Sequence, residues 1–148
     1  MHNFLVEQLT FEKIGEAAEL DRLCFSLPWS KKSFEMLCDG KNVGFVAVDE
    51  NGRVVAYGGM LVVLDEGQIT NIAVHPDFRR QGLGKKIVLA LLEYAKKNAL
   101  VSISLEVRES NGAAISLYEK LGFVSVGIRK NFYSLPTENA IVMIKNIG

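Results

Sequence analysis

The middle of the sequence constrains the fold most, because it places a long helix between two strands. Leu83–Asn98 repeats apolar residues at the spacing of one helical face. Runs typical of strands lie on either side of it, at Gln68–Val74 and Val101–Val107. Strands joined by such a crossover lie parallel in one sheet, with a right-handed connection. The sequence therefore predicts a parallel pair at the centre of a sheet.

Earlier in the chain, the pattern predicts an antiparallel hairpin. Gly44–Asp49 and Arg53–Val63 are rich in β-formers, and Glu50-Asn51-Gly52 separates them. Asn-Gly between two such runs is a strong hairpin signal. Gly58-Gly59 inside the second run predicts a bulge or a close approach of another segment.

The remaining elements complete a mixed α/β (α+β) sheet packed with helices, in the order β-α-α-β-β-β-α-β-α-β-β. We expect a single domain over residues 1–148. Ser30 is placed as an N-cap, and Gly122 as a helix stop. The predicted strands are Phe4–Leu9, Phe123–Ile128 and Ala140–Lys145, and the predicted helices are Lys13–Cys24, Lys31–Cys38 and Asn111–Leu121.

Composition excludes several classes of protein. Lys plus Arg and Asp plus Glu are each 17, and a zero net charge argues against a general nucleic-acid binder. The longest strictly apolar run, Ile87–Leu92, is too short to cross a membrane. The first residues lack the basic start of a secretory signal, so we expect a cytoplasmic protein. Two cysteines and two histidines predict neither a disulfide framework nor a metal site.

One segment predicts an anion site. A strand runs into a basic turn with two glycines, Arg79-Arg-Gln-Gly82-Leu-Gly84, and this turn opens the long helix. Free N–H groups and the helix dipole at such a start attract a phosphate, which glycines allow to approach closely. The P-loop pattern and the third glycine of a dinucleotide-binding fold are both missing. A helix cap without a ligand is the alternative on this local pattern alone.

Taken whole, the segment resembles the pyrophosphate-binding motif of the GNAT acyltransferases, (Arg/Gln)-x-x-Gly-x-(Gly/Ala). Asn71-Ile-Ala-Val-His-Pro76 also looks like the strand before that motif. The predicted order of elements is the family's order, so the resemblance extends over nearly the whole chain. It implies the GNAT fold, and acetyl-CoA as co-substrate with no metal.

Three further segments narrow the resemblance. They are Leu105–Asn111, Ala114–Phe123 and Arg129–Tyr133. Together they are similar to the bacterial enzymes that acetylate the N-terminal alanine of a small-subunit ribosomal protein. The resemblance implies a protein N-terminus as acceptor, with no direct contact to nucleic acid or membrane. The alternatives are a small amine or a lysine side chain as acceptor, or a CoA-binding module without catalysis.

The resemblance also implies roles for individual residues. It makes Glu106 the general base and Tyr118 the general acid, and places Tyr133 in the acceptor groove. Asn111 corresponds to a contact further along the cofactor. The acyl and pantetheine contacts correspond to Ile72, Ala73 and Val74. The pyrophosphate contacts correspond to Arg79, Arg80, Gln81, Gly82, Leu83, Gly84 and Lys85.

The chemistry explains why these residue types are suitable. An α-amine has a pKa of about 7.7–8, so it is partly protonated near neutral pH and needs a base. Simpler roles remain open for each residue. Glu106 alternates with apolar neighbours and could face solvent, Tyr118 lies on the apolar stripe of its helix, and Asn111 is placed as an N-cap. Two roles stay open for Phe25–Trp29: it could be an anchor in the core or part of the wall of the acceptor groove.

Overall fold

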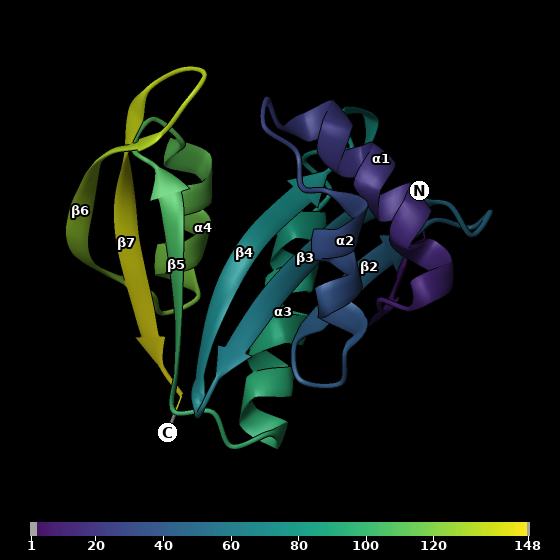
Figure 1. Cartoon of the computed structure of the whole chain (residues 1–148), viewed down its shortest axis with the longest axis horizontal. Coiled ribbons are helices and arrows are strands. Elements are labelled where there is room, and N and C mark those ends of the chain that lie inside the picture. The colour runs from purple at the N-terminus through teal and green to yellow at the C-terminus, as the bar shows by residue number, and fades with distance from the viewer. Residues whose placement is uncertain (1–2, 148) are drawn as a thin grey trace.

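The computed structural model describes residues 3–147 and contains a seven-stranded sheet in the order β1-β2-β3-β4-β5-β7-β6 (Figure 1). Neighbouring strands are antiparallel except for β4 and β5, which are parallel as the sequence predicts. The strands are β1 (Leu5–Gln8), β2 (Val43–Val48), β3 (Val54–Val63), β4 (Glu66–Val74), β5 (Ser102–Arg108), β6 (Val124–Tyr133) and β7 (Glu138–Asn146).

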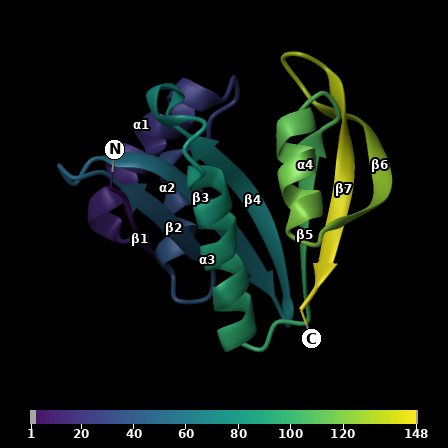
Figure 2. The same cartoon turned by 180° about the vertical axis from the view of Figure 1, so that it is seen from behind.

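Helices cover both faces of the sheet. One face carries α1 and α2 over the strands β2 to β4, and the other carries α3 and α4 (Figures 1 and 2). The helices are α1 (Ile14–Cys24), α2 (Lys31–Glu35), α3 (Leu83–Lys97) and α4 (Gly112–Lys120), with short 3-10 turns at Phe11–Lys13, Met36–Cys38 and Pro76–Phe78. The order of strands and helices is the predicted one. No helix within residues 3–147 is long and apolar enough to cross a membrane.

Two layers of core explain why β3 has no polar face. Its residues Val54–Met60 are all buried, because α3 packs on one side of the sheet and α1 with α2 on the other. Ile87 and Leu91 of α3 belong to the first layer, and Phe34 of α2 belongs to the second. A strand buried on both faces shows a continuous apolar run, as the sequence does here.

The two glycines in β3 mark both a bulge and a close approach, which confirms the prediction. The register between β3 and β4 shifts between Gly58 and Met60. A Cβ atom on Gly58 would clash with Ile87 Cγ2 and would lie 2.7 Å from Ile72 Cδ1. Side chains on both neighbouring elements therefore occupy the space that any other residue would need.

The parallel pair β4–β5 is short, and this divides the sheet. The two strands pair only at Glu66↔Ser102, Gly67↔Ile103 and Gln68↔Ser104. Beyond Gln68, β4 continues beside β3 while β5 continues beside β7, so the strands diverge (Figure 1). The opening lies at the carboxyl ends of β4 and β5, where ligands of parallel sheets commonly bind.

Several boundaries differ from the sequence prediction. The helix expected over Lys31–Cys38 is α-helical only to Glu35 and continues as a 3-10 turn, although Ser30 caps it as predicted. The strand expected to end at Ile128 continues to Tyr133. Its added residues lie at the edge of the sheet, and Arg129, Lys130 and Asn131 are exposed and charged or polar, so only pairing with β7 shows them to be a strand.

Candidate active site

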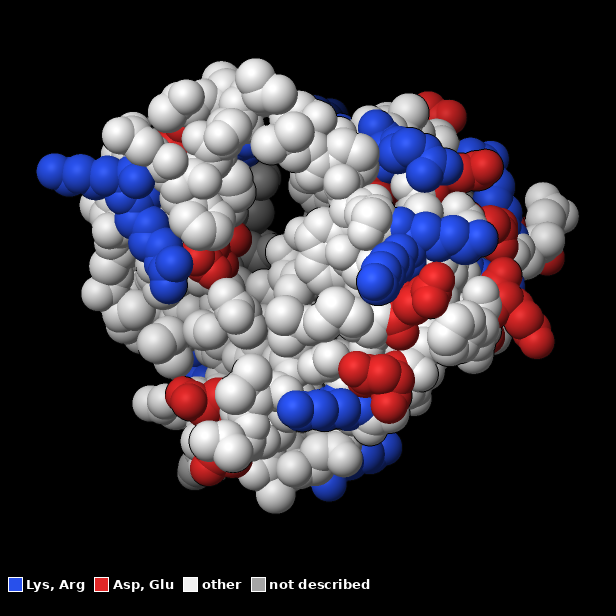
Figure 3. Space-filling model, viewed as in Figure 1, with Lys and Arg blue, Asp and Glu red and all other residues white. Residues whose placement is uncertain are grey.

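A hollow separates the half of the molecule built on β1–β4 from the half built on β5–β7 (Figure 3). One wall is the edge of β4 beyond Gln68, where β5 no longer pairs with it. After β4 the chain runs through the glycine turn into α3. The other wall is β5, where Ile103, Leu105 and Val107 are buried toward α3 and α4. Successive side chains of a strand point to opposite faces. Glu106 therefore points to the face that carries α1 and α2.

The predicted acyl and pantetheine residues form the edge of the first wall. Ala73 pairs with Tyr57, and the N–H of His75 donates to Val55 C=O at 2.8 Å, so these two residues face β3. Main-chain groups alternate sides along an antiparallel strand. Those of Ile72 and Val74 therefore face the opening, where they can bond a ligand.

The glycine turn forms the start of α3, as predicted, while its binding of an anion stays a prediction. Gly82 is the N-cap of α3 with a φ of +76°, and Arg80 is also left-handed with a φ of +65°. The N–H of Lys86 donates to Gly82 C=O at 3.1 Å. The N–H groups of Leu83, Gly84 and Lys85 precede this bond and have no partner within the helix. A Cβ on Gly82 would meet nothing within 4 Å, so there is open space beside the N-cap of α3.

The charged and polar side chains of the predicted pyrophosphate segment are all exposed, and Arg79 also bonds back to the chain. Arg80, Gln81 and Lys85 are exposed beside the helix start. Arg79 donates from Nε to Val74 C=O at 3.2 Å, and its Nη2 approaches Cys24 Sγ at 3.9 Å. Arg79 therefore ties the turn to the end of β4 and to α1. Burial raises the pKa of the Cys24 thiol, which disfavours the thiolate.

Asn111 is the N-cap of α4. Its Oδ1 accepts from the N–H of Ala114 at 3.1 Å. The role of Asn111 as an N-cap, which the sequence left open, is thus confirmed, while its contact with a cofactor stays a prediction. The Asn111 side chain is exposed at a second helix start on the same side of the sheet as α3.

Glu106 has a defined place in the second wall instead of facing solvent freely. Its Oε1 accepts from Gln68 Nε2 at 2.9 Å, and its Oε2 lies 3.3 Å from Arg129 Nε. The Glu106 side chain is only 12% exposed. Gln68 lies where the strands β4 and β5 begin to separate, so the carboxylate is held at the base of the opening.

Tyr118 lies in the core below the opening, against Phe123, with ring centroids 5.8 Å apart. Burial, with Tyr133 as a lesser cause, raises the pKa of Tyr118 to about 12. The phenol is therefore protonated near neutral pH and can donate a proton. Tyr118 therefore packs in the core, and its role as proton donor stays a prediction.

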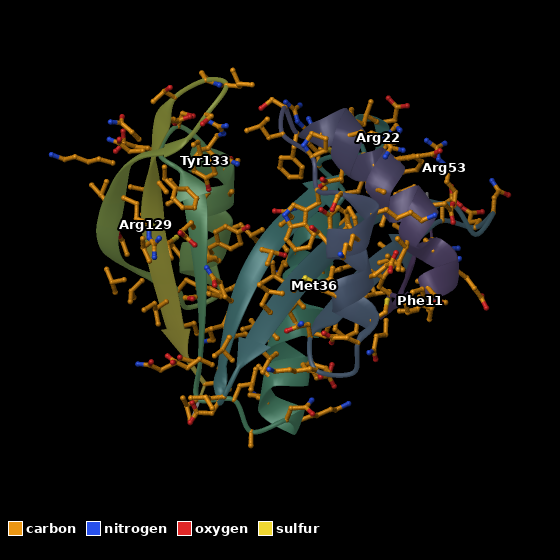
Figure 4. The ribbon with its side chains drawn as sticks, viewed as in Figure 1. Phe11, Arg22, Met36, Arg53, Arg129 and Tyr133 are labelled. Carbon is orange, nitrogen blue, oxygen red and sulfur yellow. The ribbon has the colours of Figure 1, made fainter. Side chains whose placement is uncertain are left out.

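Tyr133 links the two predicted catalytic residues electrostatically. Burial, and to a lesser extent the Glu106 carboxylate, raises the pKa of Tyr133. Tyr133 is in turn the lesser cause of the raised pKa of Tyr118. The Arg108 guanidinium lies over the Tyr133 ring, 4.4 Å from its centroid, and pairs with Glu138 at 3.3 Å. Figure 4 shows Tyr133 on the half built on β5–β7, above Arg129.

On the opposite side of the opening, a buried carboxylate that the sequence analysis missed joins α1 to β3 and to the Trp29 loop. Asp21 on α1 is fully buried, accepts from the Tyr57 hydroxyl, and accepts from the Trp29 N–H at 2.6 Å. Asn71, in the bulge of β4, donates to the Tyr57 hydroxyl at 3.0 Å. The Trp29 ring packs against Phe34, which makes Trp29 a core anchor. A charged residue on the apolar stripe of its helix was the signal available for Asp21.

Two loops meet across the opening. Ser26, between α1 and α2, donates from Oγ to Leu135 C=O at 2.9 Å, and Leu135 lies between β6 and β7. Each loop belongs to a different half of the sheet. This contact therefore bridges the two halves of the sheet beside the opening. No cluster of three or more His, Cys, Asp or Glu within residues 3–147 is placed to bind a metal.

The sequence matches the acetyltransferase (GNAT) family over residues 14–123. The chain belongs to the GNAT acetyltransferase family. Acetyl-CoA is the acetyl donor of this family, and the β4 edge and the start of α3 offer main-chain donors in open space for such a ligand. The protein is accordingly an acetyltransferase, as the resemblance in the sequence implied.

Named relatives extend over almost the entire chain. The ribosomal protein bS18-alanine N-acetyltransferase of Escherichia coli K12 is 38% identical, with 93% of this chain and 94% of that protein aligned. The enzyme of that name from Salmonella typhimurium is 40% identical, over 91% and 92%. The crystal structure of the Escherichia coli ribosomal-protein-S18-alanine N-acetyltransferase superposes with a TM-score of 0.91 at 36% identity, over 99% of this chain and 95% of the other.

Proposed function

We propose that this protein transfers the acetyl group of acetyl-CoA to the N-terminal α-amine of a protein, and that its acceptor is the N-terminal alanine of ribosomal protein bS18. The observation that carries the proposal is the near full-length similarity to enzymes of that name. A ribosomal protein as acceptor places the reaction in the cytoplasm.

Glu106 is the base in this proposal. An α-ammonium must lose its proton before its nitrogen can attack a thioester, and a carboxylate held at the base of the opening can accept that proton directly or through a water. Gln68 fixes one carboxylate oxygen by a 2.9 Å hydrogen bond. That bond leaves Oε2 as the oxygen that can accept a proton, and Arg129 Nε lies 3.3 Å from it in the free protein.

The rest of the reaction uses the two walls. The main-chain N–H groups of Ile72 and Val74 face the opening and can stabilise the negative charge that develops on the thioester oxygen. As the new C–N bond forms and the C–S bond breaks, Tyr118 donates its phenolic proton to the departing sulfur. The raised pKa of Tyr118, about 12, keeps that proton available until it is needed. The residues of the chain form no covalent intermediate.

The contact between Ser26 and Leu135 supports a chain end as acceptor. Because the two loops touch, they limit the directions from which an amine can enter. A free N-terminus carried by an extended backbone fits such an opening. Tyr133, half-buried beside Glu106 and held by Arg108, limits the room for the first side chain. This arrangement favours a small first residue such as alanine.

The test compares three acceptors. Initial rates are measured on a short peptide that starts with alanine, on the same peptide with a blocked α-amine and an internal lysine, and on spermidine. We expect the free alanine peptide to be acetylated fastest, and peptides that start with Leu or Phe to be slower. Faster turnover of the blocked peptide or of spermidine would assign the protein to lysine or small-amine acetylation instead.

A matched pair of variants tests the base. Glu106→Gln keeps the size of the side chain and removes the proton acceptor, so turnover should fall by roughly 10²–10⁴ while acetyl-CoA binding persists. Glu109→Gln makes the same change at an exposed residue just past β5 and should keep full activity. Equal activity of the two variants at neutral pH would show that Glu106 is not the base.

A further inference from the structure

The Glu106 carboxylate already has a cation beside it. Arg129 lies on the edge strand β6, and its Nε is 3.3 Å from Glu106 Oε2. The Arg129 side chain is 60% exposed, whereas that of Glu106 is 12% exposed. The guanidinium therefore covers the carboxylate on its solvent side. Figure 4 shows Arg129 on the half that carries β5–β7, below Tyr133.

This cation occupies the place that an acceptor amine needs. The amine approaches as an ammonium group and must come within hydrogen-bond reach of a Glu106 oxygen. Gln68 holds the other oxygen and is neutral, so it does not repel the ammonium. The guanidinium does repel it, because two positive charges a few ångströms apart raise the energy of the complex.

The contact between Arg129 and Glu106 is weak enough for the guanidinium to move away. A single nitrogen faces Glu106, and an exposed ion pair of this kind contributes little to stability. The Arg129 guanidinium also lies over the half-exposed Phe132 ring, 5.6 Å from its centre. It can therefore leave Glu106 and keep its contact with Phe132 and with water.

We infer that Arg129 is a displaceable counter-ion: it neutralises the Glu106 carboxylate in the free protein and is replaced there by the ammonium group of the acceptor. The inference rests on the proposed function only in taking Glu106 as the base. Arg129 is a positioning residue in this scheme, since it touches neither the acetyl group nor the thiol. The strength of its ion pair with Glu106 determines how much the binding of the acceptor amine at Glu106 is weakened.

The experiment separates the Michaelis constant from turnover. Arg129→Gln should lower the KM of the acceptor about fivefold, the factor that a surface ion pair of about 1 kcal/mol supplies, with kcat and the KM of acetyl-CoA unchanged. Arg129→Lys keeps the cation and should stay near the wild-type KM. Arg22→Gln removes an arginine exposed on α1, away from the opening (Figure 4), and should change neither constant.

An acceptor KM that is unchanged or raised in Arg129→Gln would overturn the inference, as would an equal fall in Arg22→Gln. The comparison uses whichever of the alanine peptide, the lysine peptide and spermidine the wild-type protein acetylates fastest. The identity of that acceptor tests the proposed function. The KM ratio between variants tests the counter-ion, so either can fail without the other.

Discussion

Gly82 begins α3 with a φ of +76°, and a side chain there would extend into the open space before the helix N–H groups. Gly82→Val therefore has two separate effects. The left-handed backbone costs a non-glycine residue about 1–2 kcal/mol of folding free energy. The two methyl groups would also fill the space assigned to the pyrophosphate, which we expect to weaken acetyl-CoA binding at least tenfold, or about 1.4 kcal/mol.

Gly52 provides a matched control for the backbone cost. It has a φ of +79° in the β2–β3 hairpin, and a Cβ there would also meet nothing within 4 Å. Gly52→Val should lose a similar free energy of unfolding, which lowers Tm by about 2–8 °C. Because the hairpin is outside the cofactor turn, this variant should bind acetyl-CoA as the wild type does.

Thermal unfolding with and without acetyl-CoA separates the two effects. At a ligand concentration of about 100 times the wild-type Kd, the wild type and Gly52→Val should each gain about 2.7 kcal/mol. A tenfold weaker Gly82→Val should gain only about 1.4 kcal/mol, roughly half the shift in Tm. An equal ligand-induced shift in the two valine variants would refute the placement of the pyrophosphate at this turn.

Three further variants and one control test other parts of the structure. Tyr57→Phe removes the hydroxyl that donates to the buried Asp21, so urea unfolding should show a loss of about 1–3 kcal/mol. Gly58→Ala overpacks the core and should cost about 1–3 kcal/mol in the same assay, whereas Gly127→Ala, with open space around it, should cost less than 1 kcal/mol. Tyr118→Phe should lower turnover with little change in Tm; lost stability with retained turnover would show that the residue only packs.

The elements with strong local patterns were predictable from the sequence. The long apolar stripe of α3 and the Asn-Gly hairpin each have a local physical cause, and both predictions are confirmed. The two glycines of β3 are also visible in the sequence, but the side chains that approach Gly58 come from α3 and β4. Pairing between distant strands decided the rest. Arg129, Lys130 and Asn131 in the second half of β6 are exposed and charged or polar, so only the partner β7 identifies them as part of a strand. The expectation of a single domain stays a prediction.

The candidate site shows the same division between local and distant causes. The glycine turn and the caps Ser30 and Asn111 could be found in the sequence because a cap bonds to residues close by in the chain. The neighbours of Glu106 could not, since Gln68 and Arg129 come from strands far from it in the sequence. Roles for single residues came from the family resemblance and await the variants above.

The separation of β4 from β5 also has a consequence for amide hydrogen exchange. The N–H groups of Ile72 and Val74 lie near the centre of a seven-stranded sheet, yet no neighbouring strand within residues 3–147 pairs with them. In deuterated water they should exchange as quickly as amides at a sheet edge, while the N–H of Ala73, facing β3, stays protected. Saturation with acetyl-CoA should slow exchange at Ile72 and Val74, because a ligand lying along that edge would take the place of the missing strand.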